Sequence, residues 1–224
     1  MAFVLHVEKY TKQDLKGLEI HNERKPQYNL SNKDIDVTRT HENYHIGDYS
    51  DNYLRKFEEI KKERVTGLVR KTSVAGVGIL VSADNDFFKK LSKEREKDFF
   101  NSVYSKIVDK YGTENIISAV VHKDETTPHM HIMLCPVTDD GRLTAKELFG
   151  RNSLRELQDI AIELQKEGFS IERGDSDRKV KHLSEEEFKL SQAFKQLEEE
   201  KQKILEEKKQ IETERNFLIS ERER

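Results

Sequence analysis

The alternation of hydrophobic and polar residues is clearest between residues 129 and 137, where it has the two-residue period of a β-strand. Successive side chains of a strand point to opposite faces of a sheet. One face is expected to carry Met130, Ile132 and Leu134, and the other His129, His131, Met133 and Cys135. Apolar, β-branched runs at 74–83 and 115–121 predict buried strands. The second run delivers His122 to a polar loop, so the sequence predicts a hairpin of 115–121 and 129–137.

Hydrophobic spacing and capping residues predict two helices in the first half of the chain. The first is expected to run past His21 toward Lys25, where Pro26 stops it. The second is expected to follow the cap residues at 82–86 as one long helix with an apolar stripe, and to end at Gly112.

The remaining pattern completes the predicted fold. A strand is expected at 2–7, a helix at 153–165 and a last short strand at 169–171, whereas the polar, tyrosine-rich segment 27–53 predicts irregular structure. Together these elements predict an α/β (α+β) fold, with a mainly antiparallel central sheet flanked by helices.

The pattern changes after residue 182, so we expect a folded domain at 1–182 and a charged helical segment at 183–224. Within that segment, apolar residues recur every seven positions at Leu190, Leu197, Ile204, Ile211 and Leu218. A coiled coil needs a second apolar position in each heptad. Here those positions are Phe194, Lys201, Lys208 and Arg215. The pattern favours a long exposed helix that either dimerises weakly or stays solvated without a partner, and that begins a longer C-terminal region.

Charge is distributed unevenly along the 224 residues. The chain has 40 Lys+Arg and 43 Asp+Glu, and residues 183–224 hold 9 and 12 of them, so 40−9 and 43−12 leave 31 of each in 1–182. A neutral domain can still bind nucleic acid through a local basic surface. The cations Lys61, Lys62, Arg64, Arg70 and Lys71 form such a cluster, for which a solvated loop and helix end is the alternative.

Cysteine usage and hydropathy bear on location. The chain has one cysteine, Cys135, which rules out an internal disulfide and fits a reducing cytoplasm. No run of 18 apolar residues is present, so no membrane-spanning segment is expected. The first residues lack the charged and apolar regions of a signal peptide.

Three imidazoles and a carboxylate fall within residues 122–131. His129 and His131 share one face of the predicted strand, and His122 lies across the hairpin from His129, where paired Cβ atoms are about 4.5–5.5 Å apart. Three neutral imidazoles can bind one ion and leave positions open for water or a phosphate oxygen. Glu125 could ligate the ion, orient a histidine or act as a base, and Asp124 could cap the turn. The alternative is a set of ordinary half-buried strand histidines.

Three motifs resemble those of a known family. His122-x-Asp124-Glu125-x-x-Pro128-His129-x-His131 resembles the third motif of the MobV (Mob/Pre) plasmid relaxases, which belong to the HUH nucleases. His21-x-x-Arg24 resembles the first motif, and Asp36-x-x-Arg39-Thr-x-x-Asn43-Tyr44 the second. The resemblance covers residues 1–182 and implies an HUH relaxase-like fold.

The resemblance also implies a reaction and roles. Such an enzyme nicks one strand of plasmid DNA at the origin of transfer, becomes joined to the 5′ phosphate and can religate, for conjugative mobilisation in the bacterial cytoplasm. His21 matches the nucleophile, and Tyr44 is the rival nucleophile or a base-stacking residue. Arg24 would hold a phosphate and Arg39 the DNA backbone.

The implied cofactor is a divalent metal held by His122, His129 and His131. Imidazole ligands favour Mn²⁺, with Mg²⁺ or Zn²⁺ as alternatives, and His41 and His45 are expected not to be ligands. Two other functions fit parts of the sequence. One is a rolling-circle replication initiator, although the helix at 153–165 lacks the tyrosine such enzymes carry. The other is a DNA-binding regulator that dimerises through its C-terminal helix and holds a structural zinc.

Overall fold

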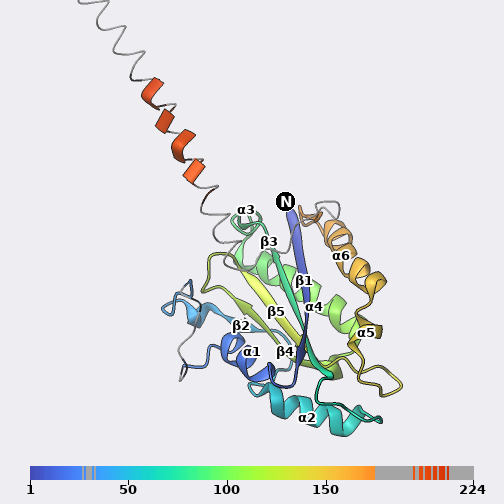
Figure 1. Cartoon of the computed structure of the whole chain (residues 1–224). Helices are drawn as coiled ribbons and strands as arrows, with labels where there is room; N and C mark the ends of the chain where they lie inside the picture. Colours follow the sequence, from blue (N-terminus) through green and yellow to red (C-terminus); the bar gives the residue numbers. More distant parts are fainter. Residues whose placement is uncertain are drawn as a thin grey trace, which may run out of the picture. The chain divides into compact units, whose positions relative to one another are not determined.

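The computed structural model of the chain (Figure 1) divides into two compact units, residues 1–175 and 176–224. The sequence pattern put this boundary after residue 182. The structure describes residues 1–26, 28, 32, 34–174, 194, 197–198, 200–202, 204–205, 207–209 and 211.

Six strands form one sheet in the order β2-β4-β5-β3-β1-β6. They are β1 (Ala2–Thr11), β2 (Tyr44–His45), β3 (Val74–Ala83), β4 (Ile116–His122), β5 (His129–Leu134) and β6 (Glu172–Arg173). Neighbouring strands are antiparallel, except that β1 and β6 run parallel. A mainly antiparallel sheet flanked by helices confirms the predicted fold class.

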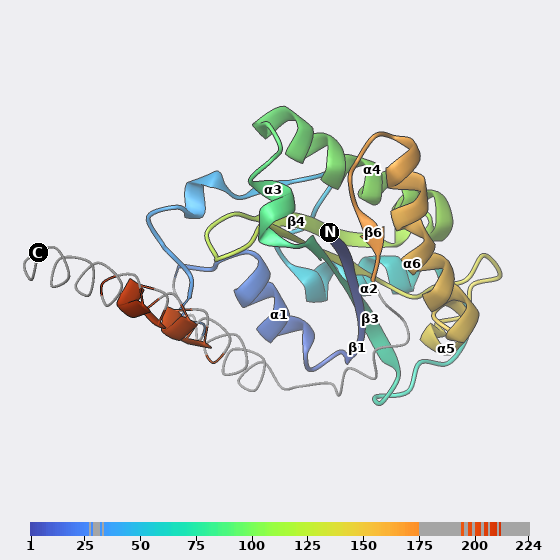
Figure 2. The same ribbon diagram turned by 90° about the horizontal axis from the view of Figure 1, so that it is seen from above.

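Among the described residues of 1–174, six α-helices accompany the sheet. They are α1 (Leu15–Asn22), α2 (Tyr53–Arg64), α3 (Asn85–Phe88), α4 (Lys93–Tyr111), α5 (Ala145–Leu148) and α6 (Arg151–Lys166). Short 3₁₀ turns occur at Thr40–Glu42 and Thr113–Asn115. Helices α4 and α1 lie on opposite sides of the sheet (Figure 2).

Each face of the sheet has its own apolar core. The α4-side core includes Phe99, Val103 and Ile107 of α4 together with Leu157 and Leu164 of α6. The α1-side core is smaller and includes Leu15, Tyr53, Phe57, Ile117, Met133 and Cys135. Because both faces are covered, the central strands are apolar on both sides, as in the fully buried β4.

The hairpin of β4 and β5 confirms the predicted alternation. Met130, Ile132 and Leu134 belong to the α4-side core, and Met133 and Cys135 belong to the α1-side core. His129 and His131 therefore face the side of the sheet that α1 covers. Strand β3 has the bounds that the sequence predicted.

One helix prediction is wrong, and one helix was not predicted. The long helix expected after 82–86 is interrupted, because Ser92 begins α4 anew by accepting a hydrogen bond from the backbone N–H of Arg95. The cations at 61–64 belong to α2, a twelve-residue helix that the sequence pattern did not reveal. Asn52 caps α2 by accepting from the backbone N–H of Arg55.

Other element ends also differ from expectation. Helix α1 ends at Asn22 rather than near Lys25, and Arg24 has a left-handed φ of 46°. The short final strand is Glu172–Arg173, because Phe169 and Ile171 are buried in the α4-side core instead.

The long C-terminal helix is not confirmed. The described positions between 194 and 211 are helical, whereas Leu190, Arg215 and Leu218 of the heptad pattern lie outside the described residues. Within the described residues, no helix combines the length and apolar character needed to cross a membrane.

Candidate metal centre and its polar surroundings

The central hairpin brings the three histidines of the third motif together. His122 of β4 is the cross-strand partner of His129, and His131 pairs with Val120. The ring centroid of His122 lies 5.2 Å from that of His129 and 4.9 Å from that of His131. The ring centroids of His129 and His131 are 4.9 Å apart. The geometry therefore assembles the predicted ligand set on one face.

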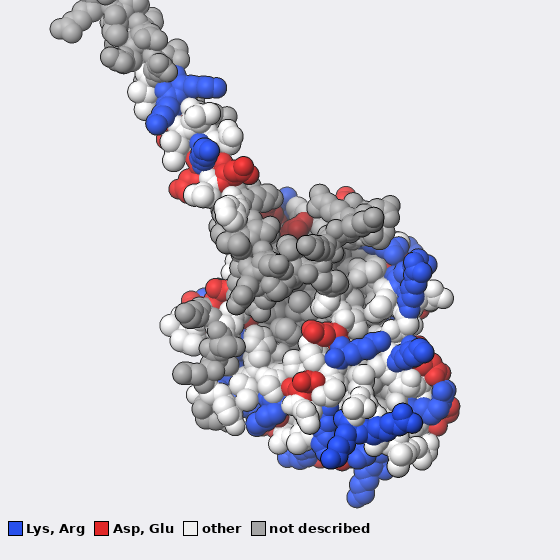
Figure 3. Space-filling model, in the orientation of Figure 1, with Lys and Arg blue, Asp and Glu red and all other residues white. Residues whose placement is uncertain are grey.

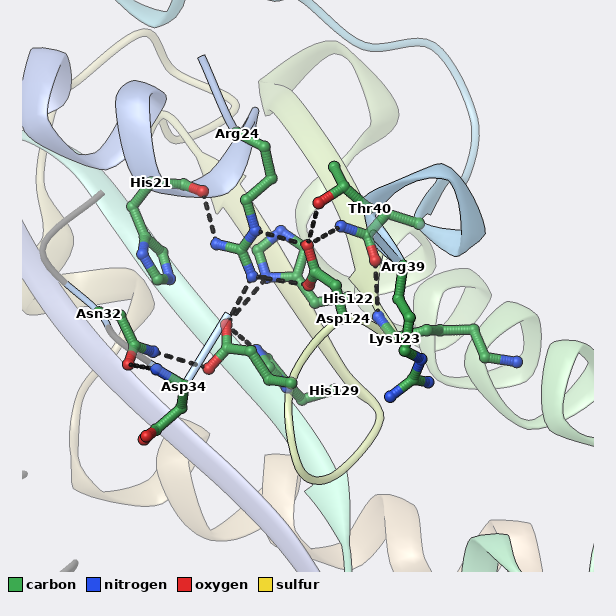
Figure 4. Close-up of polar contacts among 12 residues, drawn as sticks. His21, Arg24, Asn32, Asp34, Arg39, Thr40, His122, Lys123, Asp124 and His129 are labelled. Atoms are coloured by element: carbon green, nitrogen blue, oxygen red, sulfur yellow. Dashed lines mark hydrogen bonds and ion pairs between the residues drawn. The ribbon is translucent and has the colours of Figure 1, made fainter. Parts of the chain in front are cut away.

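Helix α1 adds a fourth imidazole to this cluster. The ring centroid of His21 lies 5.8 Å from that of His122 and 5.5 Å from that of His131. The helix is held against the sheet by Leu15, which is fully buried in the α1-side core. The expected helix thus carries His21 to the hairpin, as Figure 4 shows.

Two overlapping groups of side chains have the spacing of a metal site. In each group, one ligand atom from every member lies within 4.8 Å of the others. The first group is His21, His122 and His131, and the second is His122, Glu125 and His129. His122 is common to both.

The imidazoles of His122 and His131 suit a metal ion because burial keeps them neutral. Burial, followed by the neighbouring His129 and His122, holds the pKa of His131 well below its ordinary value. Burial and then the charge of Arg24 lower the pKa of His122 in the same direction. The Nε2 atom of His131 is buried and has no hydrogen-bond partner among the described residues. A buried lone pair of this kind is what a metal ligand requires.

Both ring nitrogens of His122 and one of His129 already have protein partners. His122 donates from Nε2 to the backbone carbonyl of Asn22 at 2.8 Å, and its Nδ1 lies 2.9 Å from Nη2 of Arg24. His129 donates from Nδ1 to the carbonyl of Thr127 at 2.8 Å. A carbonyl partner fixes the tautomer and the ring orientation. His129 therefore offers Nε2 to a ligand, and an ion on His122 must replace one of its two contacts.

Arg24 lies at the centre of the polar network in Figure 4. Its Nη2 is 2.5 Å from Oε1 of Glu125, and its Nε and Nη2 each donate to Asp124 at 3.0 Å. Its Nη1 donates to the backbone carbonyl of His21 at 2.8 Å. The guanidinium is almost fully buried, and the left-handed backbone of Arg24 turns it inward.

Asp124 is the residue whose role the sequence reasoning missed. Besides Arg24, its fully buried carboxylate accepts from Thr40 Oγ1 at 3.0 Å and from Asn43 Nδ2 at 2.8 Å. Burial alone would raise the pKa of this carboxyl, but the hydrogen bonds from Arg24 and Asn43 outweigh it and hold the pKa far below its usual range. The second motif thus supports the hairpin through Asp124, and only membership of the motif hinted at this.

Glu125 lies between Arg24 and His129. Its Oε1 is 3.7 Å from Nε2 of His129, and its Oε2 accepts from Nδ2 of Asn32 at 2.9 Å. A carboxylate in this position can orient both a cation and an imidazole.

Two predicted site residues are not brought to the histidines. Tyr44 of β2 packs on the α4-side core, with its ring 5.6 Å from Nζ of Lys97, so it faces away from the cluster. Burial, followed by the charge of Glu96, raises the pKa of its hydroxyl well above 10. Arg39 is exposed and pairs with Glu42 at 2.9 Å.

The cation cluster lies at the other end of the sheet. Residues 65–73 lead into the start of β3, where β3 pairs with the end of β5. His129, at the start of β5, pairs with Ser82 at the opposite end of β3. Lys61 pairs with Glu58 and Arg64 with Glu114, both at 3.3 Å. Figure 3 shows Lys and Arg side chains gathered along the lower edge, in the region of α2. Within this cluster, Lys62, Arg70 and Lys71 are exposed and form no ion pair with the residues that the structure describes.

Comparison with known proteins identifies relatives. The profile of the Mob_Pre family, described as plasmid recombination enzyme, matches residues 1–190. A plasmid recombination enzyme of Bacillus thuringiensis is 38% identical over 193 residues, which cover 84% of this chain and 42% of that protein. One from Lactiplantibacillus plantarum is 37% identical over 194 residues, covering 84% and 54%. The chain therefore spans about half the length of these relatives.

Solved structures of the same family have a similar fold. The Mn-bound relaxase domain of MobM with origin-of-transfer DNA of plasmid pMV158 superposes with a TM-score of 0.79 at 33% identity, covering 85% of this chain and 100% of that one. A second MobM complex, whose DNA carries a 3′ thiophosphate, gives 0.80 at 33% identity, covering 85% and 99%. The family is the one that the three motifs resembled. By sequence and by fold, this chain belongs to the Mob_Pre (MobV) family of plasmid recombination enzymes.

Proposed function

We propose that this chain is a metal-dependent relaxase domain that nicks one DNA strand at a plasmid origin of transfer by transesterification. The observation that carries the proposal is the position of His21, whose ring lies within 6 Å of two histidines of the hairpin. An attacking group and a metal site at this spacing can act on one phosphorus atom. Acting on plasmid DNA, the enzyme would work in the bacterial cytoplasm.

The cofactor we propose is Mn²⁺, held by His122, His129 and His131. The related MobM structures are Mn-bound, and imidazole suits Mn²⁺ or Zn²⁺ better than Mg²⁺. A bound divalent ion would neutralise charge on the non-bridging phosphate oxygens. The neutral, buried imidazoles of His122 and His131 fit that ion.

The nucleophile we propose is His21. Its imidazole would attack the scissile phosphorus, the 3′ oxygen would leave, and the 5′ phosphate would stay on the protein as a phosphoramidate. Reversal of the same step would rejoin the strand. Tyr44 is the weaker candidate because its hydroxyl faces the other side of the sheet and burial disfavours the phenolate.

Arg24, Asp124 and Glu125 would position these groups. All three kinds of N–H on Arg24 are committed to protein acceptors, so we propose that it aligns His21 and Glu125 rather than gripping the phosphate alone. Glu125 would in turn orient His129. Together they preorganise the site before DNA arrives.

DNA contacts would come from the surface cations. Lys62, Arg70 and Lys71 are exposed, and we propose that they bind the backbone of origin DNA beyond the nick, with weaker contributions from Arg39, Lys61 and Arg64. Replacing Lys62 with Ala should weaken binding and flatten its dependence on salt, because a phosphate contact releases counterions.

The adduct tests the proposed reaction. The protein is incubated with Mn²⁺ and an oligonucleotide from the origin of its own plasmid, and the covalent complex is isolated. A phosphoramidate breaks down in acid and survives alkali, whereas a phosphotyrosine survives acid. The adduct should disappear in His21→Ala and persist in Tyr44→Phe and in His41→Ala, an exposed histidine outside the cluster. An acid-stable adduct that His21→Ala still forms would refute the proposal.

A further inference from the structure

The two candidate metal groups share His122, so they are overlapping parts of one site. They differ in which partner completes them: Glu125 and His129 in one, His21 and His131 in the other. Their surroundings decide which set is better prepared to receive a divalent cation before DNA binds.

The group that contains Glu125 already holds a positive charge. Nη2 of Arg24 lies 2.5 Å from Oε1 of Glu125 and 2.9 Å from Nδ1 of His122. The guanidinium thus occupies the space toward which these two ligand atoms converge. A divalent ion there would meet a buried cation at contact distance, which is strongly repulsive where water is scarce.

The group that contains His21 offers three imidazoles and no carboxylate bound to Arg24, although Arg24 also contacts the shared His122 at Nδ1. His131 contributes a buried Nε2 with no hydrogen-bond partner among the described residues. The rings of His21 and His131 are only 5.5 Å apart between centroids, and their planes are nearly perpendicular at 82°. The unpaired buried Nε2 of His131 costs free energy unless a ligand satisfies it.

We propose that in the DNA-free protein His21 joins the hairpin histidines His122, His129 and His131 as a ligand of the divalent ion, so that the residue proposed as nucleophile is itself a metal ligand at rest. This inference rests on the proposed function of His21. When DNA binds, a non-bridging phosphate oxygen replaces the imidazole: one metal–nitrogen bond breaks and one metal–oxygen bond forms. No proton moves and no oxidation state changes, and His21 regains its lone pair beside the phosphorus.

This arrangement would mask the nucleophile until substrate arrives. A coordinated imidazole has no lone pair with which to attack other phosphates or electrophiles. The exchange also gives the phosphate an open position without changing the number of ligands on the ion.

The test measures Mn²⁺ affinity without DNA. Free Mn²⁺ is followed by its electron paramagnetic resonance signal in the whole chain and in the variants His21→Ala, His129→Ala and His41→Ala. Loss of His21 should weaken binding at least about tenfold, since even residues that only support a ligand cost about 10–100-fold. His129→Ala should weaken binding as well, and His41→Ala should bind as the parent does. Unchanged affinity in His21→Ala would overturn the inference.

A second measurement uses the parent protein and does not depend on how a variant folds. Electron spin-echo modulation counts the ¹⁴N nuclei bound directly to Mn²⁺. One coupling should vanish when an oligonucleotide ending in a phosphate is added, and an unaltered set of couplings would also overturn the inference. The proposed function fails separately, through an adduct that forms without His21.

Discussion

At Asp124, four donor atoms from two segments meet one buried carboxylate. Arg24 provides two of them, and Thr40 and Asn43 provide the others. The carboxylate therefore fixes the position of the guanidinium that in turn contacts His122 and Glu125. The arrangement therefore depends on the negative charge of the Asp124 carboxylate, and not on its shape alone.

We predict that Asp124→Asn lowers the free energy of unfolding by about 3 kcal/mol, because it removes the fully buried one of the two carboxylates that neutralise Arg24 and leaves Glu125 alone to do so. The new amide would also turn a donor toward Arg24 donors. Urea unfolding followed by circular dichroism measures the change.

A matched control is Asp86→Asn. Asp86 pairs with Lys89 at 3.0 Å, but both side chains are exposed, so this change should have a much smaller effect on the free energy of unfolding. Equal losses in the two variants would contradict the argument that burial makes the Asp124 pair important.

Cys135 gives a prediction about alkaline pH. Burial raises the pKa of its thiol from 9.0 to about 12, although Arg64 acts in the opposite direction. Between these values the unfolded chain loses a proton that the folded chain keeps, so stability falls as pH rises. By pH 10 this contribution should reach about 1.4 kcal/mol.

The variant Cys135→Ala isolates that contribution, since burial also raises the pKa of tyrosines such as Tyr111 and so lowers stability at alkaline pH in the same direction. Unfolding free energies are compared at pH 8 and pH 10 in both proteins. The parent should lose more stability than Cys135→Ala over this interval. The same loss in both would mean that the thiol ionises as easily in the folded protein as in the unfolded chain.

The sequence predicted which histidines gather on one face of the sheet better than it predicted the residues that support them. Period-two alternation is enough to put His129 and His131 on one face, because a strand leaves no other choice. The role of Asp124 depends on the irregular segment that carries Thr40 and Asn43, and no periodicity describes that segment. The direction of Tyr44 depends likewise on its pairing with Val121, which only the sheet order reveals.

Among the elements, α1 matters most for the site because it carries His21. The helix approaches the sheet at Gly76, where a Cβ atom would come within 2.9 Å of both Leu15 Cδ2 and Met133 Sδ. A glycine in a strand interior often marks such a close approach.

We predict that Gly76→Ala lowers the free energy of unfolding by about 1–3 kcal/mol, because the added methyl group overpacks the contact between α1 and β3. It should also weaken Mn²⁺ binding, since α1 moves His21 with it. Urea unfolding and Mn²⁺ titration check the two effects.

Gly17→Ala is the natural comparison, because it adds the same methyl group to α1 at a position with nothing within 4 Å. Alanine favours a helix over glycine by about 1 kcal/mol, so this variant should be more stable than the parent. A destabilised Gly17→Ala, or a neutral Gly76→Ala, would argue against tight packing of α1 on the sheet.

Helix and strand boundaries were less predictable than their existence. The apolar stripe from Phe87 to Val108 continues through Ser92, so spacing alone predicted one helix. The break becomes visible only when Ser92 is recognised as a cap with its own hydrogen bond. Helix α2 was hidden because its charged face dominates its composition, and its three buried residues are Tyr53, Phe57 and Ile60.

At the scale of the molecule, the sheet order explains why the site needs most of the first unit. The histidines come from β4 and β5 at its centre, His21 comes from the N-terminal end of the chain, and the last strand, β6, pairs with β1 near residue 173. The sequence predicted a mainly antiparallel sheet, but not the parallel pairing of β6 with β1. The two residues of β6 are too few to give a periodic signal.

The last prediction concerns where the domain can end. A chain of residues 1–182 should unfold with the same free energy as the whole chain and should bind Mn²⁺ equally well, because every described residue of the site lies between 21 and 131. A chain of residues 1–168 loses Phe169 and Ile171, both almost fully buried, and removing two such side chains costs about 4 kcal/mol or more. Thermal and urea unfolding of the three chains separates these cases. If 1–182 were as unstable as 1–168, the segment after residue 182 would be part of the domain rather than an appended helix.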